Sequence, residues 1–238
     1  MSTSCAPLLF VLALPLAGCG GGGSVSSPPA EPRHGEHVHG HHGHPGGHGH
    51  HRFEDAERWA EVFDDPARDA WQKPDEVVAA LALARDARVA DIGAGTGYFA
   101  VRLARAVPDG KVYGVDIEPD MVRYLTERAQ REELSNLTAV LGAADDARVP
   151  EPVDVVLVVD TYHHIADRVP YFTRLAASLR PGGRLVIVDF TPESPMGPPA
   201  EMRIPLERVL AELAEAGYHE VARHDFLPNQ FFVEVARR

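Results

Sequence analysis

Three glycines at alternate positions, Gly93, Gly95 and Gly97, stand between an apolar run and a helical pattern that begins at Tyr98. Glycine lets the backbone turn tightly and approach a ligand closely, because no Cβ intervenes. Asp116 ends the next apolar run, where a carboxylate can accept hydrogen bonds from ribose hydroxyls. The spacing therefore predicts a strand, turn, helix and second strand that together hold a nucleoside.

A second carboxylate, Asp91, lies at the end of the first strand, just before the glycines. A dinucleotide fold requires the spacing G-x-G-x-x-G/A, which residues 95–100 satisfy only in a forced register. A carboxylate at this place would repel a pyrophosphate, whereas it would attract the cationic amino-acid head of S-adenosylmethionine. The residues therefore favour S-adenosylmethionine over NAD as cofactor.

Candidate catalytic residues follow a run of β-branched and aliphatic residues at 153–159, which is typical of a central parallel strand. The run ends in Asp160, and His163 and His164 come shortly after it. Ligands of open parallel sheets bind outside the carboxyl ends of the strands, and imidazole titrates near neutral pH. We expect Asp160, His163 and His164 to handle protons or orient substrate. The alternative is that the histidines shape the pocket or cap the next helix.

Residues 91–97, Asp116 and the turn at residues 179–185 occur in an order that resembles the class I S-adenosylmethionine-dependent methyltransferases. The resemblance extends over residues 77–232. It implies that the methionine part of the cofactor lies at residues 91–97 and the ribose at Asp116. The whole set of implied cofactor residues is Asp91, Gly93, Ala94, Gly95, Thr96, Gly97, Asp116, Ile117, Met121 and Asp145.

The adenine contacts depart from the family pattern. The family motif Gly-Asp-Ala is replaced by Gly142-Ala143-Ala144-Asp145-Asp146, so that the acid is displaced. The resemblance assigns the adenine to Asp145 and to Met121, although a core position accounts equally well for the methionine.

The fold class expected from this pattern is α/β, a Rossmann-like doubly wound and mostly parallel seven-stranded sheet. By resemblance, its C-terminal strands form an antiparallel hairpin. The apolar runs predict strands at 111–115, 137–141, 153–159, 184–190, 218–225 and 230–236, after a first strand that ends at residue 92. Helices are expected at 53–63, 66–70, 74–85, 98–107, from 118, within 169–179, and from 206 to Gly217.

Two segments are candidate lids over the site. Residues 68–74 could place Trp71 over the cofactor, although packing of the indole against the sheet edge is the alternative that we favour. Residues 191–200 are rich in proline and lack periodicity, which is typical of a loop over the strand ends.

Composition narrows the class of partner. The chain has 238 residues and a formal net charge of −12, with no cluster of Lys and Arg that would bind a nucleic acid. Its cysteines, Cys5 and Cys19, lie outside the predicted domain, which excludes a disulfide or a cysteine zinc site within it. The missing thiols also argue against the arsenite methyltransferases, which bind their substrate through cysteines. We expect a small-molecule acceptor.

The first residues resemble a bacterial lipoprotein signal. An apolar run at 7–17 is too short to span a bilayer, and the tetrapeptide Leu16-Ala17-Gly18-Cys19 resembles a lipobox. We therefore divide the chain into a signal peptide at 1–18, a tether at 19–52 and a catalytic domain at 53–238. The expected location is the cell envelope, with a lipid anchor at Cys19. A chance apolar leader on a cytoplasmic protein is the alternative.

The tether combines a stretch rich in Gly, Ser and Pro with a histidine tract that could bind zinc, nickel or copper. A solvated spacer that binds metal incidentally is an equally good interpretation. The candidate ligands are His34, His37, His39, His41, His42, His44, His48, His50 and His51.

These patterns predict methyl transfer from S-adenosylmethionine to a small molecule. Export would separate the domain from its cytosolic cofactor, which favours a second hypothesis. In that hypothesis the chain is an envelope-anchored protein that reuses the fold to bind a metal or a nucleoside. An NAD-dependent oxidoreductase ranks last, because Asp91 and the Arg-Pro-Gly-Gly turn fit it poorly.

Overall fold

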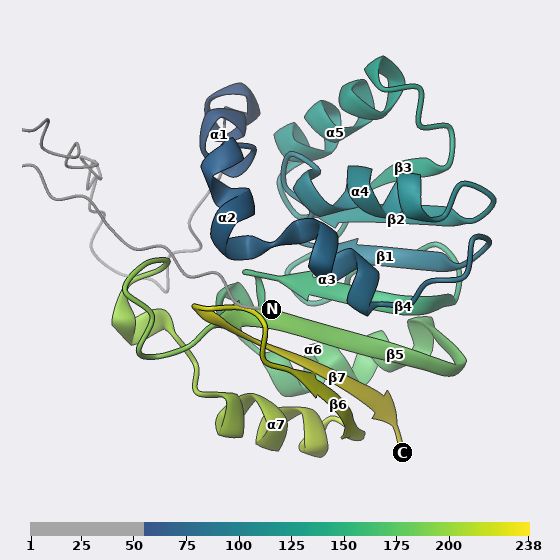
Figure 1. Ribbon diagram of the computed structural model, residues 1–238. Helices are drawn as coiled ribbons and strands as arrows, with labels where there is room; N and C mark the ends of the chain where they lie inside the picture. Colours follow the sequence, from purple (N-terminus) through teal and green to yellow (C-terminus); the bar gives the residue numbers. More distant parts are fainter. Residues whose placement is uncertain (1–54) are drawn as a thin grey trace, which may run out of the picture. The chain divides into compact units, whose positions relative to one another are not determined.

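The computed structural model describes residues 55–238. Seven strands form one sheet in the order β3-β2-β1-β4-β5-β7-β6 (Figure 1). The strands are β1 (Arg88–Ile92), β2 (Lys111–Asp116), β3 (Leu137–Leu141), β4 (Val153–Val159), β5 (Leu179–Phe190), β6 (Tyr218–His224) and β7 (Gln230–Arg237).

The sheet is parallel from β3 to β5, and β7 then pairs antiparallel with both β5 and β6. The chain order reverses between β1 and β4, so that this pair forms the switch point where open parallel sheets bind ligands. This topology confirms the predicted fold class, including the antiparallel C-terminal hairpin.

Helices cover both faces of the sheet (Figure 1). The α-helices are α1 (Ala56–Phe63), α2 (Asp69–Gln72), α3 (Pro74–Ala80), α4 (Tyr98–Ala106), α5 (Pro119–Arg131), α6 (Arg168–Leu175) and α7 (Leu206–Glu215). Short 3-10 turns, η1 (Pro66–Arg68), η2 (Tyr162–His164), η3 (Ala176–Ser178) and η4 (Ala200–Met202), complete the order.

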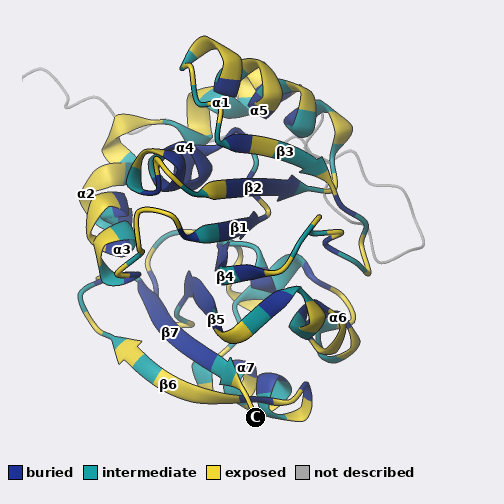
Figure 2. Ribbon diagram, turned by 90° about the vertical axis from the view of Figure 1, so that its right-hand side faces the viewer, coloured by how far each residue is buried: buried dark blue, intermediate teal, exposed yellow. Residues whose placement is uncertain are grey.

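The apolar core has two parts because successive side chains of a strand point to opposite faces. Val155 and Leu157 of β4 join the cluster that packs under α3, α4 and α5. Val156 and Val158 join the cluster under α6 and α7. The central strand β4 is buried except at Asp154, and the edge strand β6 is largely exposed (Figure 2). Burial on both faces explains why the central strands read as continuous apolar runs.

Element boundaries differ from the predictions where the backbone becomes left-handed. The helix predicted at 74–85 ends at Ala80, because Ala82 has a φ of 44°. The helix predicted at 66–70 divides into η1 and α2, and α2 ends at Gln72, because the next residue, Lys73, has a φ of 45°. The fifth strand begins at Leu179 rather than at residue 184, with an irregular register against β4. Propensity alone does not reveal such left-handed residues.

Several predictions fall among residues 1–54 and therefore lie outside the described residues. They are the signal peptide, the anchor at Cys19, and the histidine tract from His34 to His51. Within residues 55–238, no helix is long and apolar enough to cross a membrane.

Candidate functional site

The glycine loop lies at the carboxyl end of β1. Gly93, Gly95 and Gly97 have φ values of 76°, 53° and 96°, which side chains rarely tolerate. A Cβ at Gly93 would overlap the side chain of Thr161, and one at Gly97 would overlap Leu125. The loop therefore requires glycine both for its backbone angles and for its contacts.

Asp116, at the end of β2, holds this loop in place. Its Oδ2 accepts a hydrogen bond of 2.8 Å from the backbone N–H of Gly95, and its Oδ1 accepts one of 3.0 Å from that of Glu118. Burial raises the pKa of Asp116. The predicted ribose acid therefore lies beside the glycine loop, as the sequence pattern requires.

Asp91 is buried behind the loop without a full set of partners. Its side chain is 3% exposed, and among the described residues neither its Oδ2 nor the Thr96 hydroxyl has a hydrogen-bond partner. Burial and the nearby carboxylate of Asp116 raise the pKa of Asp91 to about 7, although Arg68 opposes the increase. A buried carboxylate with an unused oxygen fits a ligand that brings a positive charge or a donor.

An N-terminal segment of residues 55–73, here called the strap, includes α1, η1 and α2 and packs against the loop. The ring of Phe63 lies 3.4 Å from the position of a Cβ at Gly95. Arg128 of α5 donates both to Asp64, at 2.8 Å, and to the carbonyl of Thr96, at 3.0 Å. Arg128 thus joins the strap to the backbone of the predicted cofactor loop.

Four side chains of the strap and the sheet close a ring of hydrogen bonds. Arg68 donates through Nε to Gln72 at 3.1 Å and through Nη2 to Asp160 at 3.2 Å. Gln72 donates to Gln230 at 2.7 Å, and Gln230 donates to Asp160. Sequence reasoning found Asp160 but missed the other three members, since Gln230 belongs to β7 and no local pattern points to it.

Asp160 itself is strained and electrostatically unfavourable when ionised. It has a φ of 51°, directly after β4. Burial raises its pKa to about 7, Arg68 and His163 oppose the increase, and Asp189 adds to it. Strained, titratable residues of this kind cluster at functional sites.

His163 forms a buried pair with Asp189 of β5. Its Nδ1 lies 2.9 Å from Asp189 Oδ1, and the two side chains are 3% and 6% exposed. The backbone N–H of His163 also donates to this carboxylate at 3.2 Å. The ring of His164 lies against that of His163, with centroids 4.2 Å apart. Asp189 was not among the residues predicted from sequence, although it lies next to the last residue of a predicted strand at the same edge.

The residues predicted to contact the adenine differ widely in exposure. Met121 is buried at 1% exposure, while Ile117 is 45% exposed beside Asp116. Asp145 lies apart from both, with a side chain that is 78% exposed and 3.5 Å from Arg174 of α6. The structure therefore brings Asp91, the glycine loop, Asp116 and Asp160 to one edge of the sheet. The carboxylate of Asp145 instead pairs with Arg174 of α6.

Contacts with other side chains hold both candidate lids in place. Trp71 packs on Phe190 of β5 with ring centroids 5.6 Å apart, which agrees with the packing alternative. The loop at residues 191–200 is fastened by Arg203, which donates to the carbonyls of Pro198 at 2.8 Å and of Ser194. Side chains thus fix both segments over the carboxyl ends of the strands.

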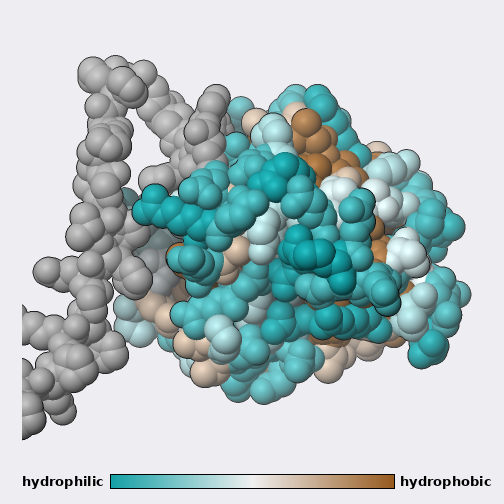
Figure 3. Space-filling view, turned by 90° about the horizontal axis from the view of Figure 1, so that it is seen from above, coloured by the Kyte–Doolittle hydropathy of each residue, from teal (hydrophilic) through white to brown (hydrophobic). Residues whose placement is uncertain are grey.

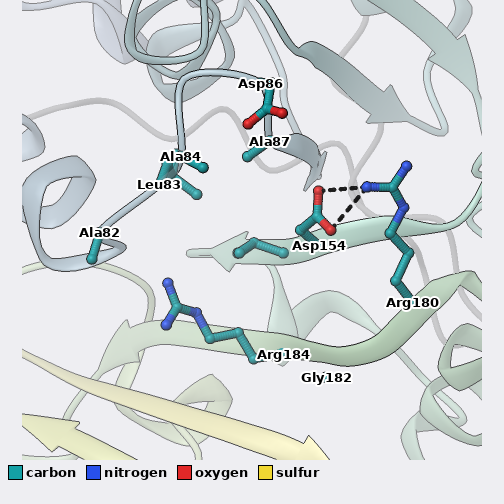
Figure 4. Close-up of a pocket in the computed structure, with 10 residues that line it drawn as sticks. Ala82, Leu83, Ala84, Asp86, Ala87, Asp154, Arg180, Gly182 and Arg184 are labelled. Atoms are coloured by element: carbon teal, nitrogen blue, oxygen red, sulfur yellow. Dashed lines mark hydrogen bonds and ion pairs between the residues drawn. The ribbon is translucent and has the colours of Figure 1, made fainter.

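A cavity of about 390 Å³ lies at the opposite end of the sheet, where β4 and β5 begin. Figure 4 shows Arg180 directed at Asp154, and the two side chains are 3.0 Å apart. None of the sequence-predicted site residues lines this cavity. Since parallel sheets bind ligands at the carboxyl ends of their strands, we do not assign the cofactor here.

One face of the surface and the metal-binding side chains of residues 55–238 can be compared with the candidate site. The face seen from above is mainly hydrophilic, with small apolar areas (Figure 3). No group of three or more His, Cys, Asp or Glu side chains within residues 55–238 could hold a metal ion.

Comparisons with known proteins point to one family. Residues 83–225 match the model of a methyltransferase domain. The chain is 32% identical over 167 residues to the 27-O-demethylrifamycin SV methyltransferase of Amycolatopsis mediterranei, covering 63% of this chain and 61% of that protein. It is 29% identical to the demethylmenaquinone methyltransferase of Deinococcus radiodurans, covering 63% of each. The chain thus spans less than two thirds of the length of these relatives.

A solved structure agrees with these matches. The S-adenosylmethionine-dependent methyltransferase of Aquifex aeolicus superposes with a TM-score of 0.70 at 26% identity. The superposition covers 76% of this chain and 97% of that one.

Proposed function

The chain belongs to the methyltransferase domain family, and on this premise we propose that it transfers a methyl group from S-adenosylmethionine to a small-molecule acceptor. The observation that carries the proposal is the carboxyl edge of β1, with its three left-handed glycines and the unpartnered oxygen of Asp91. These features fit a ligand with a cationic amino-acid head. They fit a pyrophosphate poorly, because Asp91 would repel it.

Each part of the cofactor would contact a different set of residues at this edge. Asp91 and the loop of Gly93, Ala94, Gly95, Thr96 and Gly97 would hold the methionine part. Asp116 would accept hydrogen bonds from the ribose, and Ile117 would offer apolar contact to the adenine. Met121 is 1% exposed and would reach the adenine only if its neighbours moved. Asp145 is a weaker assignment, because its carboxylate faces Arg174.

When bound, S-adenosylmethionine supplies a methyl group already activated by the sulfonium. The protein therefore needs mainly to hold the acceptor close and to accept its proton. His163 suits this task, since a neutral ring that donates Nδ1–H to Asp189 keeps Nε2 as a proton acceptor. Asp160 and His164 lie beside it and would orient the acceptor.

The class of acceptor follows from the relatives. The two curated relatives are named for 27-O-demethylrifamycin SV and for demethylmenaquinone, which are both small molecules. The formal charge of −12 also disfavours a nucleic acid. We therefore propose a small organic acceptor whose reacting group loses a proton.

Calorimetric titration of the full chain with S-adenosylmethionine, S-adenosylhomocysteine and NAD tests the proposal. We expect the first two to bind and Asp116→Ala to weaken both about a hundredfold, because two charge-assisted hydrogen bonds are lost. Asp109→Ala is the control, since this carboxylate is 61% exposed and pairs with Arg85 away from the loop. Binding of NAD alone would overturn the proposal.

We further propose export with a lipid anchor at Cys19 and adventitious binding of zinc, nickel or copper by the histidine tract. Both rest on the sequence pattern of residues 1–54. Fractionation of cells that express the wild-type chain or Cys19→Ser tests the anchor, and a chain that stays soluble in both would refute it. Metal binding without any cofactor binding would favour the envelope binding protein instead.

A further inference from the structure

The carboxyl edge of the sheet carries more buried negative than positive charge. Asp91 ends β1, Asp116 ends β2, Asp160 follows β4 and Asp189 lies near the end of β5. His163 pairs with Asp189. The remaining acids, Asp91, Asp116 and Asp160, are grouped around the loop that would receive the cofactor.

The neighbouring cations of the helices bring carboxylates of their own. Arg128 of α5 pairs with Asp64 and Glu132, both at 2.8 Å. Arg102 of α4 pairs with Asp69 at 3.2 Å. These guanidinium groups therefore do not offset the charges of the edge.

Arg68 is placed differently. Its side chain is 15% exposed and lies 3.2 Å from Asp160, and its guanidinium carbon lies 4.1 Å from the centre of the Tyr98 ring. Arg68 lowers the pKa of Asp160 and also that of Asp91. Gln72 and Gln230 complete its hydrogen-bonded ring without adding charge. Arg68 is thus the counter-ion of Asp160, and its positive charge also acts on Asp91.

Resting on the proposed function, we propose that Arg68 is a specificity-determining residue of the cofactor site. It is an internal cation that competes with the charged cofactor for Asp91 and Asp160. It thereby sets how strongly the site distinguishes the sulfonium substrate from the uncharged thioether product. The Coulomb energy of a site depends on its net charge, and the sulfonium carries one positive charge that the thioether lacks.

A purely structural role for Arg68 predicts a different outcome. Loss of the ring would loosen the strap and weaken both ligands equally, because the strap contacts the loop through Phe63 and is joined to it through Asp64 and Arg128. Loss of a competing cation would instead strengthen the binding of the sulfonium ligand and leave that of the uncharged thioether unchanged. The ratio of the two dissociation constants therefore separates the two roles.

Arg68→Met and Arg68→Lys form a matched pair, since both keep a long stem and only lysine keeps the charge. We expect the ratio of the S-adenosylhomocysteine to the S-adenosylmethionine dissociation constant to rise about tenfold in Arg68→Met at pH 8.5. Arg68→Lys should keep the wild-type ratio. The pH is chosen so that Asp91 and Asp160, with pKa values of about 7, are ionised.

Asp160→Asn gives the opposite test and remains available if Arg68→Met does not fold. Removal of a carboxylate should lower the same ratio about tenfold. The tryptophans, Trp59 and Trp71, both lie in the strap, so their fluorescence reports whether a variant has displaced it.

An unchanged or reduced ratio in Arg68→Met, with the strap fluorescence intact, would overturn the inference and leave the proposed function standing. If the wild-type chain binds neither ligand, the proposed function itself fails.

Discussion

Two partly buried carboxylates of this protein have nearly the same exposure but opposite electrostatic surroundings. Asp160, at the cofactor edge, is 20% exposed, and Glu212 of α7 is 17% exposed. Burial raises the pKa of Asp160 to about 7. Burial also acts to raise that of Glu212, but Arg168, Tyr162 and Arg208 together lower it to about 2.

The number of charged donors accounts for the difference. Glu212 accepts from Arg168 at 2.6 and 3.0 Å, from Tyr162 at 2.8 Å and from Arg208 at 2.9 Å. Asp160 has one guanidinium and one amide, with Asp189 close enough to repel it. The negative charge of Glu212 is thus balanced by its protein partners. The charge of Asp160 is balanced only in part, which leaves it for a ligand to balance. Functional sites are the usual places where such local rules are broken.

The largest expected effect comes from the backbone, where a glycine of the site can be compared with one outside it. Gly93 and Gly182 have similar φ values, 76° and 78°, but a Cβ would meet Thr161 at the first and nothing within 4 Å at the second. We expect Gly93→Ala to lower the free energy of unfolding by about 3 kcal/mol, from strain plus overlap. Gly182→Ala should lower it by about 1 kcal/mol, from strain alone. Urea unfolding measures both, and equal losses would show that contacts at the loop do not matter.

The next test compares the two carboxylates directly. Glu212→Ala should lower the free energy of unfolding by about 2 kcal/mol, because Arg168 is left partly buried without its partner. Asp160→Asn should cause a smaller loss at pH 8. It leaves Arg68 without its counter-ion, but it also removes a charge that the fold accommodates poorly. Thermal unfolding of both variants decides the matter. A larger loss for Asp160→Asn would reverse the comparison.

The smallest effect concerns pH. The folded-state pKa of Asp91 is about 7, against an ordinary value of 3.8, so the folded chain binds more protons between these values. Stability of the cofactor-free protein should therefore fall as the pH rises from 6 to 7, by about 1 kcal/mol for this group. Asp91→Asn should reduce the slope of melting temperature against pH over this range and leave the part that comes from Asp160, while Asp109→Asn should leave the slope unchanged. An identical slope in Asp91→Asn would exclude Asp91 as its source.

Several parts of the site could be read from sequence because their causes are local. Alternate glycines after an apolar strand predict a left-handed loop, and Gly93, Gly95 and Gly97 adopt it. The run at residues 153–159 predicts a strand buried on both faces, which β4 confirms. Asp116 was predicted from its position in the sequence, at the end of the strand that follows the glycines. Its hydrogen bond with Gly95 agrees with that prediction. The export signal and the histidine tract remain predictions from sequence.

The partners of these residues were decided only by the tertiary structure. Gln230 lies beside Asp160 because the C-terminal strand β7 inserts next to β5, and Asp189 meets His163 because β4 and β5 are neighbours. Arg68 reaches across 92 residues to Asp160 once the strap has packed on the sheet. A local pattern specifies backbone angles and which face is buried, whereas the pKa of a carboxylate depends on which distant charges folding brings near it.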